Sequence, residues 1–257
     1  MKGRERNSAF FQKSKEDVES TSGSGGLLRL YKTARETGKL NLSGRALSLI
    51  PDTVFTLATT LDEGDKFWEV NPLTRLDLSS NVLKDIPNGK FDQIKGDLTY
   101  LNLKDNKLKS VPGDLFACNQ LKYLNLSLNE LENVTDSIGE LVDLKELFLS
   151  NNKLATVPIS VAQCKELQTI ELQNNILTRI PLESLNLPQL LKLNLSSNKL
   201  TEIPVSISRL ISLGQHLFLL VLRLCSFINF LLCLSRLSFC ILFCLAFCHY
   251  LFLSFSI

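Results

Sequence analysis

Six asparagines recur along the chain at intervals of 25, 23, 23, 23 and 23 residues, and this spacing constrains the fold more than any other feature. They are Asn81, Asn106, Asn129, Asn152, Asn175 and Asn198. Each lies in the same apolar frame, which around Asn152 reads Leu144-x-x-Leu147-x-Leu149-x-x-Asn152-x-Leu154-x-x-Val157-Pro158. A fixed period of this length means that one short supersecondary unit is repeated. The units must therefore stack into a solenoid, because none can bury its leucines alone.

Each unit predicts one short strand followed by a turn. In Leu76–Leu78 the residues alternate at period two, so the two leucines point to one face and Asp77 to the other. The asparagine is expected to end the strand and to bond nearby backbone groups without carrying a charge. Most units then place a proline where the chain leaves the sheet, which fixes φ there; the third unit has Thr135 instead. The return arms to the next strand are short and are predicted to be 3₁₀, single-turn or irregular.

The predicted fold class is α/β: a solenoid with parallel strands on its concave face, short return arms and one shared core. Leu101, Leu124 and Leu147 of adjacent units should meet in that core. The expected organisation is a disordered segment at 1–25, a cap helix at 26–38, about seven units at 39–213 and an apolar helical tail at 214–257. The first unit is atypical because Arg45 replaces the asparagine, and residues 56–72 are expected to form an insertion that contains Trp68.

The segment Leu27–Thr37 predicts the cap helix. Its apolar positions 27, 28, 30, 31 and 34 give one face, and Gly38 can terminate the helix. This helix should cover the first unit, because the terminal units of a solenoid need a cap.

The start of the chain and the cysteine usage indicate a protein of the reducing cytosol, and the net charge bears on the kind of partner. The net charge of +2 is close to neutral and argues against a nucleic-acid partner. The start of the chain, Met1 to Glu19, is charged and lacks the apolar core of a secretory signal. A cytoplasmic location is therefore predicted, with Cys118 and Cys164 as free thiols lining the core.

The tail, from Leu217 to Ile257, contains no Lys, Asp or Glu, and two interpretations of it stay open. Residues 237–257 have no formal charge and are long enough to span a bilayer, which predicts a transmembrane anchor and a membrane-associated protein. Alternatively the tail is a translated intron, because it consists largely of Leu, Phe, Ser, Cys and Ile, which have pyrimidine-rich codons. In both cases an isolated apolar run favours a helix.

The sequence predicts no catalytic, cofactor-binding or metal site, and hence no enzyme. It has no glycine-rich phosphate loop and no paired C-x-x-C motif. The only histidines, His216 and His249, are in or next to the tail, so the units have none for a nucleophile–base pair. Cys240, Cys244 and Cys248 share one helical face, but their apolar surroundings do not supply the charges of a metal site.

The outward positions of the strands form columns that carry the candidate site. The predicted partner-binding residues are Arg75, Asp77, Tyr100, Asn102, Lys104, Tyr123, Asn125, Glu146, Phe148, Glu171 and Lys192. Among them Tyr100, Tyr123 and Phe148 form an aromatic diagonal on a face with no core to fill, and charged residues surround it, as at the centre and rim of an interface. The alternative is that the rings pack only on each other and stabilise the sheet.

The L-x-x-L-x-L-x-x-N-x-L frame resembles the leucine-rich-repeat family. The segment Gly26–Phe55, with Leu40-Asn-Leu-Ser-Gly-Arg45, and the acidic insertion before Leu73 resemble the opening of an intracellular member of that family. The resemblance covers about residues 26–211. It implies a curved intracellular solenoid of many more repeats without known catalytic residues, whereas this chain passes into the apolar tail after about seven.

The expected function is a non-enzymatic scaffold that binds a protein partner on its concave face, without a cofactor and without nucleic acid. Two alternatives stand beside it. One is a tail-anchored membrane protein that displays its repeats to the cytosol. The other is a regulatory subunit in an intracellular signalling pathway, which rests on fold analogy alone.

Overall fold

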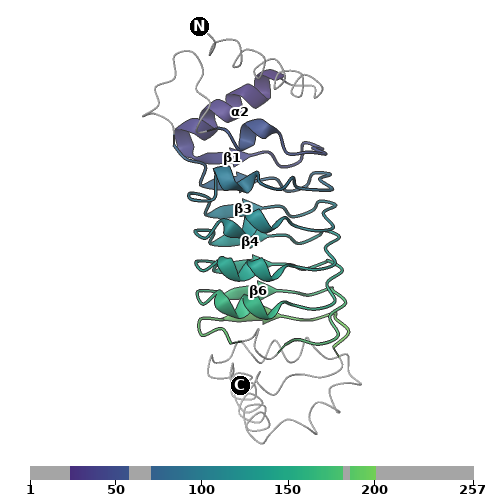
Figure 1. Ribbon diagram of the computed structural model, residues 1–257. Coiled ribbons are helices and arrows are strands. Elements are labelled where there is room, and N and C mark those ends of the chain that lie inside the picture. The colour runs from purple at the N-terminus through teal and green to yellow at the C-terminus, as the bar shows by residue number, and fades with distance from the viewer. Residues whose placement is uncertain (1–23, 58–70, 182–185, 201–257) are drawn as a thin grey trace, which may run out of the picture.

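The computed structural model describes residues 24–57, 71–181 and 186–200, and the strands in these ranges form one parallel sheet. They pair in chain order: β1 (Lys39–Asn41), β2 (Arg75–Asp77), β3 (Tyr100–Asn102), β4 (Tyr123–Asn125), β5 (Glu146–Phe148), β6 (Thr169–Glu171) and β7 (Lys192–Asn194). Figure 1 shows the coils stacked one on another along an elongated molecule. The predicted α/β solenoid is confirmed.

The core is a continuous column of leucines between the sheet and the return arms. Leu101, Leu124 and Leu147 are paired in register on β3, β4 and β5, and each is at most 1% exposed. The predicted meeting of these leucines in one dry interior is therefore confirmed. Behind them Phe55, Phe91 and Phe116 are also buried, and this aromatic part of the core did not follow from the leucine frame.

The recurring asparagines form a hydrogen-bonded ladder through the core. The Asn152 side-chain amide donates to Leu149 O of its own coil and to Leu126 O of the preceding coil, both at 3.0 Å. Its Oδ1 accepts from Leu131 N of the preceding coil, also at 3.0 Å. The amide satisfies backbone groups that the short strands leave unpaired, so each asparagine joins two coils. The spacing predicted local bonds of this kind but not the bonds between coils.

The return arms are short 3₁₀ helices, as predicted. They are η1 (Asp52–Val54), η3 (Phe91–Gln93), η4 (Gly113–Ala117), η5 (Asp136–Glu140) and η6 (Ile159–Gln163). Pro112 and Pro158 precede η4 and η6 with φ of −67° and −66°. Thr135 precedes η5 with φ −72°, so the coil without a proline follows the same path.

The cap helix α2 spans Ser24–Thr37 and lies across the first end of the stack (Figure 1). Its buried face consists of Leu27, Tyr31 and Ala34. The prediction that Leu28 belongs to this face is wrong, because Leu28 is 60% exposed. Gly38 ends the helix at φ +67°, donating to Ala34 O at 2.7 Å, and a side chain there would also collide with Pro72 O.

The first coil closes the asparagine ladder without an asparagine of its own. Arg45 is exposed, and its backbone N–H donates to Asn81 Oδ1 at 3.0 Å. Within the described residues the sheet begins with β1, so Asn81 is the first amide of the ladder.

Several predictions lie outside the described residues: the disordered start, Trp68 and most of the insertion, and the apolar tail helix. Within the described ranges, no helix is both long and apolar enough to cross a membrane.

Candidate functional site: the concave face

The concave columns have the register that their spacing predicts. Arg75, Tyr100, Tyr123, Glu146, Thr169 and Lys192 lie side by side on consecutive strands. Asp77, Asn102, Asn125, Phe148, Glu171 and Asn194 form the second row in the same way. A side chain on one strand therefore has its counterpart one strand spacing away, about 4.8 Å along the solenoid.

Four of the predicted site residues form one stack across β2 to β5. The Arg75 guanidinium carbon lies 3.5 Å from the centroid of the Tyr100 ring. Tyr100 and Tyr123 are stacked with centroids 4.3 Å apart and planes 9° apart, and Phe148 follows at 5.3 Å with a tilt of 44°. We call these four residues the concave stack. The sequence placed Arg75 beside the rings, whereas the structure makes it a member of the stack through a cation–π contact.

The rings of the concave stack are partly exposed, and one of their hydroxyl groups has a raised pKa. All three rings are partly accessible to solvent. Burial raises the pKa of Tyr100 to about 12; the neighbouring Tyr123 adds to the rise and Arg75 opposes it. The Tyr123 hydroxyl accepts a hydrogen bond from Asn125 Nδ2 at 3.2 Å. The stack therefore offers ring edges and hydroxyl groups to a partner, and the Tyr100 hydroxyl stays protonated at neutral pH.

Side chains of the second row form hydrogen bonds within the fold that were not predicted from the sequence. Asp77 Oδ1 accepts from Ser79 N at 3.0 Å, and Asn125 Oδ1 accepts from Ser127 N at the same distance. These bonds turn the chain after each strand in the manner of an Asx turn. Asp77 also accepts from Asn102 Nδ2 at 3.2 Å. These three predicted site residues are therefore already engaged within the fold.

The last two strands bring together a charged pair. Lys192 Nζ lies 2.5 Å from Glu171 Oε1, and Gln173 donates to Glu171 Oε2 at 3.3 Å. Partial burial works against ionisation of Glu171, but the bonds from Lys192 and Gln173 outweigh it and lower the pKa of this carboxyl group. In contrast, Glu146 and Lys104 are exposed and form no ion pair within the described part of the chain.

Four residues of this face were missed at the sequence level. Lys122 and Lys145 are exposed immediately before β4 and β5, and Lys39 is exposed on β1. The signal for the first two was available, because they occupy one position of the 23-residue frame. Leu128 is 42% exposed and adopts φ +58°. At the equivalent position, immediately before the ladder asparagine, the other coils have Ser, Asp, Asn or Gly.

Away from the concave face, the described ranges contain two buried thiols and a hollow. The same ranges contain no group of three or more His, Cys, Asp or Glu side chains that could hold a metal. Cys118 and Cys164 are free and buried, as predicted, and burial raises their pKa to about 12 and about 11. A hollow of about 480 Å³ near η5 and η6 contains none of the predicted site residues; it is lined by Asp136, Thr156, Val157, Pro158, Ile159, Arg179 and Pro181.

The repeated strand, ladder asparagine and 3₁₀ arm define a leucine-rich-repeat solenoid. Sequence models described as leucine rich repeat match residues 96–154 and 189–210. The matched segments are therefore similar to leucine-rich repeats in sequence. Proteins of the leucine-rich-repeat family are commonly non-enzymatic interaction modules. The closer likeness to one intracellular member stays a prediction.

Three solved structures are similar to this chain. A leucine-rich-repeat protein of Leptospira interrogans is 30% identical with a TM-score of 0.58, over 70% of this chain and 48% of that one. The plant peptide hormone receptor RGFR1 in complex with RGF2 is 29% identical with a TM-score of 0.54, over 66% and 30%. TLR13 in a complex with ssRNA13 is 26% identical with a TM-score of 0.55, over 69% and 23%. The chain thus spans less than half of each of these proteins.

Proposed function

We propose that this chain is a non-enzymatic scaffold that binds a protein partner on its concave face, centred on the concave stack. The observation that carries the proposal is three aromatic rings and an arginine stacked on the solvent side of a sheet whose core lies on the other side. Aromatic and arginine side chains are enriched among the residues that dominate binding energy at interfaces.

The leucine core does not require these rings. Leu101, Leu124 and Leu147 already fill the interior of the same coils, so the rings add nothing to its packing. Their contacts with one another contribute about 0.5–1.5 kcal/mol per pair to the stability of the sheet. They also stay half-exposed, which leaves apolar edges in water that a partner can cover.

The similar structures supply support by analogy. The titles of two of them name a complex, one with the peptide hormone RGF2 and one with ssRNA13. A protein partner is the better fit for this chain, because the inner ring faces of the stack are already covered by one another and by Arg75. The analogy covers the fold, and the partner itself is a matter for experiment.

Photocrosslinking tests the proposal directly. A benzophenone amino acid is placed at Thr169, in the first row on β6, and, as a control, at Ile159, which is 56% exposed on η6. The expected result is a discrete covalent adduct with a cellular protein from position 169 and none from position 159. Introducing Tyr100→Asp should remove that adduct, and binding to the purified partner should weaken at least about 30-fold, as for a hot-spot residue.

The purely structural role of the rings makes a different forecast. If they only stabilise the sheet, Tyr100→Asp and Tyr123→Asp will lower the melting temperature. The fraction of protein that remains folded will still give the same amount of photoadduct. That result, with folding followed by circular dichroism in the same samples, would overturn the proposal.

Cellular location and the tail stay proposals as well. We propose a cytoplasmic protein, and the alternative of a membrane anchor in residues 214–257 rests on their sequence alone. Alkaline carbonate extraction of the native protein separates the two, because an integral anchor stays in the membrane pellet. A role as a regulatory subunit in signalling would follow only from the identity of the crosslinked partner.

A further inference from the structure

The concave face carries a surplus of positive charge around the stack. Its charged side chains, together with those immediately before the strands, are the cations Lys39, Arg75, Lys104, Lys122, Lys145 and Lys192 and the acids Asp77, Glu146 and Glu171. Two of the acids are engaged within the fold, Asp77 by Ser79 and Asn102 and Glu171 by Lys192. Among these three acids Glu146 is therefore the one that stays exposed and free of an ion pair within the described ranges, and Asp105, directly after Lys104, is a further exposed acid beside them.

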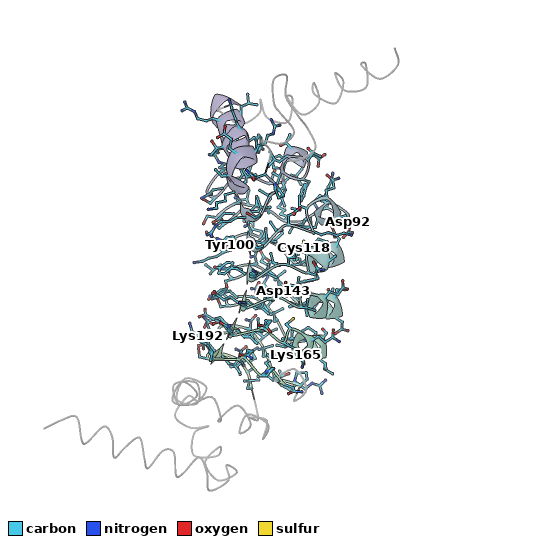
Figure 2. The ribbon with its side chains drawn as sticks, turned by 90° about the vertical axis from the view of Figure 1, so that its left-hand side faces the viewer. Asp92, Tyr100, Cys118, Asp143, Lys165 and Lys192 are labelled. Atoms are coloured by element: carbon cyan, nitrogen blue, oxygen red, sulfur yellow. The ribbon has the colours of Figure 1, made fainter. Side chains whose placement is uncertain are left out.

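The opposite face is acidic. Lys122 and Lys145, immediately before β4 and β5, are counted with the concave face. The rest of the described return arms, from the proline position onward, contain the acids Asp52, Asp92, Asp97, Asp114, Asp136, Glu140, Asp143 and Glu166, and the cations Lys90, Lys95 and Lys165. Figure 2 shows Tyr100 and Lys192 on the strand side, and Asp92 on the side of the 3₁₀ helices. The separation of positive and negative charge between the two faces is not visible in the near-neutral net charge of the whole chain. It favours approach of a negatively charged group to the concave side.

The geometry of the stack decides which kind of anion fits. Arg75 covers one face of Tyr100 and Tyr123 covers the other, while Tyr123 lies between Tyr100 and Phe148. An incoming nucleic-acid base needs an open ring face to stack on, and these inner faces are already occupied. What the rings present outward are their edges, which carry the positive part of the ring quadrupole, and their hydroxyl groups. Both suit carboxylate and carbonyl oxygens.

We propose, resting on the function proposed above, that the partner contributes an extended acidic peptide segment that lies across the strands, with carboxylates over Arg75, Lys104, Lys122 and Lys145. Single carboxylates pair with these cations, and peptide carbonyl groups accept hydrogen bonds from the tyrosine hydroxyls. Arg75 on β2 and Lys145 before β5 are three strand spacings apart, about 14 Å, which an extended peptide bridges with about four residues. The segment is therefore short and rich in Asp or Glu.

Fluorescence anisotropy with defined probes tests this inference on the full chain. The probe is a fluorescein-labelled peptide of alternating glutamate and serine, and the comparison peptide replaces every glutamate by lysine. Labelled oligouridine serves as the nucleic-acid probe. The expected result is measurable binding of the glutamate peptide, none of the lysine peptide and weaker binding of oligouridine. Raising the salt concentration should weaken binding of the glutamate peptide, because its contacts are between exposed charges, which salt screens.

Matched double variants locate the binding. Lys104→Ala with Lys122→Ala should weaken binding of the glutamate peptide about tenfold. Lys90→Ala with Lys95→Ala on the return arm should leave this affinity unchanged. Lys90 and Lys95 lie next to Asp52 and Asp92, so their removal alters only the convex side. Equal effects of the two double variants would overturn the inference, as would tighter binding of oligouridine than of the peptide.

The outcome separates this inference from the proposed function. If Tyr100→Asp removes the Thr169 photoadduct but the glutamate peptide does not bind, the concave interface stands and the acidic specificity is wrong. If neither the adduct nor the peptide responds to any concave variant, both are wrong.

Discussion

At the scale of single residues, the asparagine ladder is the feature whose loss should cost most per atom removed. Asn152→Ala would leave Leu131 N without its side-chain acceptor, at a position only 8% exposed. Leu126 O and Leu149 O would each lose one of two side-chain donors and keep those of Asn129 and Asn175. A buried backbone group that loses its partner costs about 1–3 kcal/mol, so we expect a loss in that range in the free energy of unfolding. Urea denaturation measures it.

The matched control is Asn102→Ala, which removes the same amide from a half-buried position on the concave face. Asn102 accepts from Lys104 N and donates to Asp77, both at 3.2 Å and both within reach of water. This variant should cost less than about 1 kcal/mol. Similar losses for the two variants would show that the ladder bonds contribute nothing special.

The two buried thiols give a prediction about pH. Burial raises the pKa of Cys118 to about 12 and of Cys164 to about 11, whereas an unfolded thiol has a pKa of about 8.5. The unfolded chain therefore loses these protons first, and the thiols' contribution to stability is fully present below about pH 8.5 and falls as the pH rises towards 11. Urea midpoints across this range should drop more steeply in the natural chain than in Cys118→Ala with Cys164→Ala; parallel curves would contradict it.

Residue roles followed from the sequence only where the repeat fixed them. The ladder asparagines, the buried thiols and the first row could be assigned, because a period of 23 residues places equal residues in equal surroundings. The contact of Arg75 with Tyr100 could not, because it depends on the direction that a long side chain takes. Nor could the turn bonds of Asp77, because outward spacing does not say whether a side chain bonds its own backbone.

At the scale of elements, η5 and η6 pack closely against each other at Gly139. A Cβ there would lie 2.9 Å from the backbone oxygen of Ser160 in η6, and closer still to the Gln163 side chain. Gly139→Ala should therefore push the two arms apart and lower stability by about 1–3 kcal/mol. Gly113→Ala in η4 is the control, because its Cβ would meet only Ser137 Oγ at 3.9 Å. Thermal unfolding compares them, and equal melting temperatures would contradict the close approach.

Strands and arms were predictable as elements, since alternation and proline position are local signals. The path of the third unit is instructive, because Thr135 adopts φ −72° without a proline ring to impose it. The stacking of neighbouring coils, more than the proline, therefore sets the direction of the arm. The face of α2 was partly mispredicted for a similar reason: which leucines of the helix are covered depends on how the helix crosses the first coil, and Leu28 lies beyond that contact.

At the scale of the whole molecule, the solenoid is a one-dimensional array in which each coil contacts only its neighbours. The solenoid could be predicted from the sequence period. The separation of charge between its two faces could not. That separation needs the knowledge of which positions of each arm face outward, and the net charge of +2 averages it away. The same linear construction also determines how damage should spread.

A defect in the middle of the array should stay near its own coil. Leu124→Ala on β4 creates a cavity at a position that is 0% exposed and should cost about 2–5 kcal/mol. Hydrogen exchange measured by mass spectrometry should show the amides of β3, β4 and β5 exchanging faster, with a much smaller change in α2 and β1, because protection depends on adjacent coils. Leu49→Ala, at a leucine that is 65% exposed, should change neither. Uniform acceleration from α2 to β7 would instead mean that all coils unfold as a single cooperative unit, in which case the nearest-neighbour description does not hold for this chain.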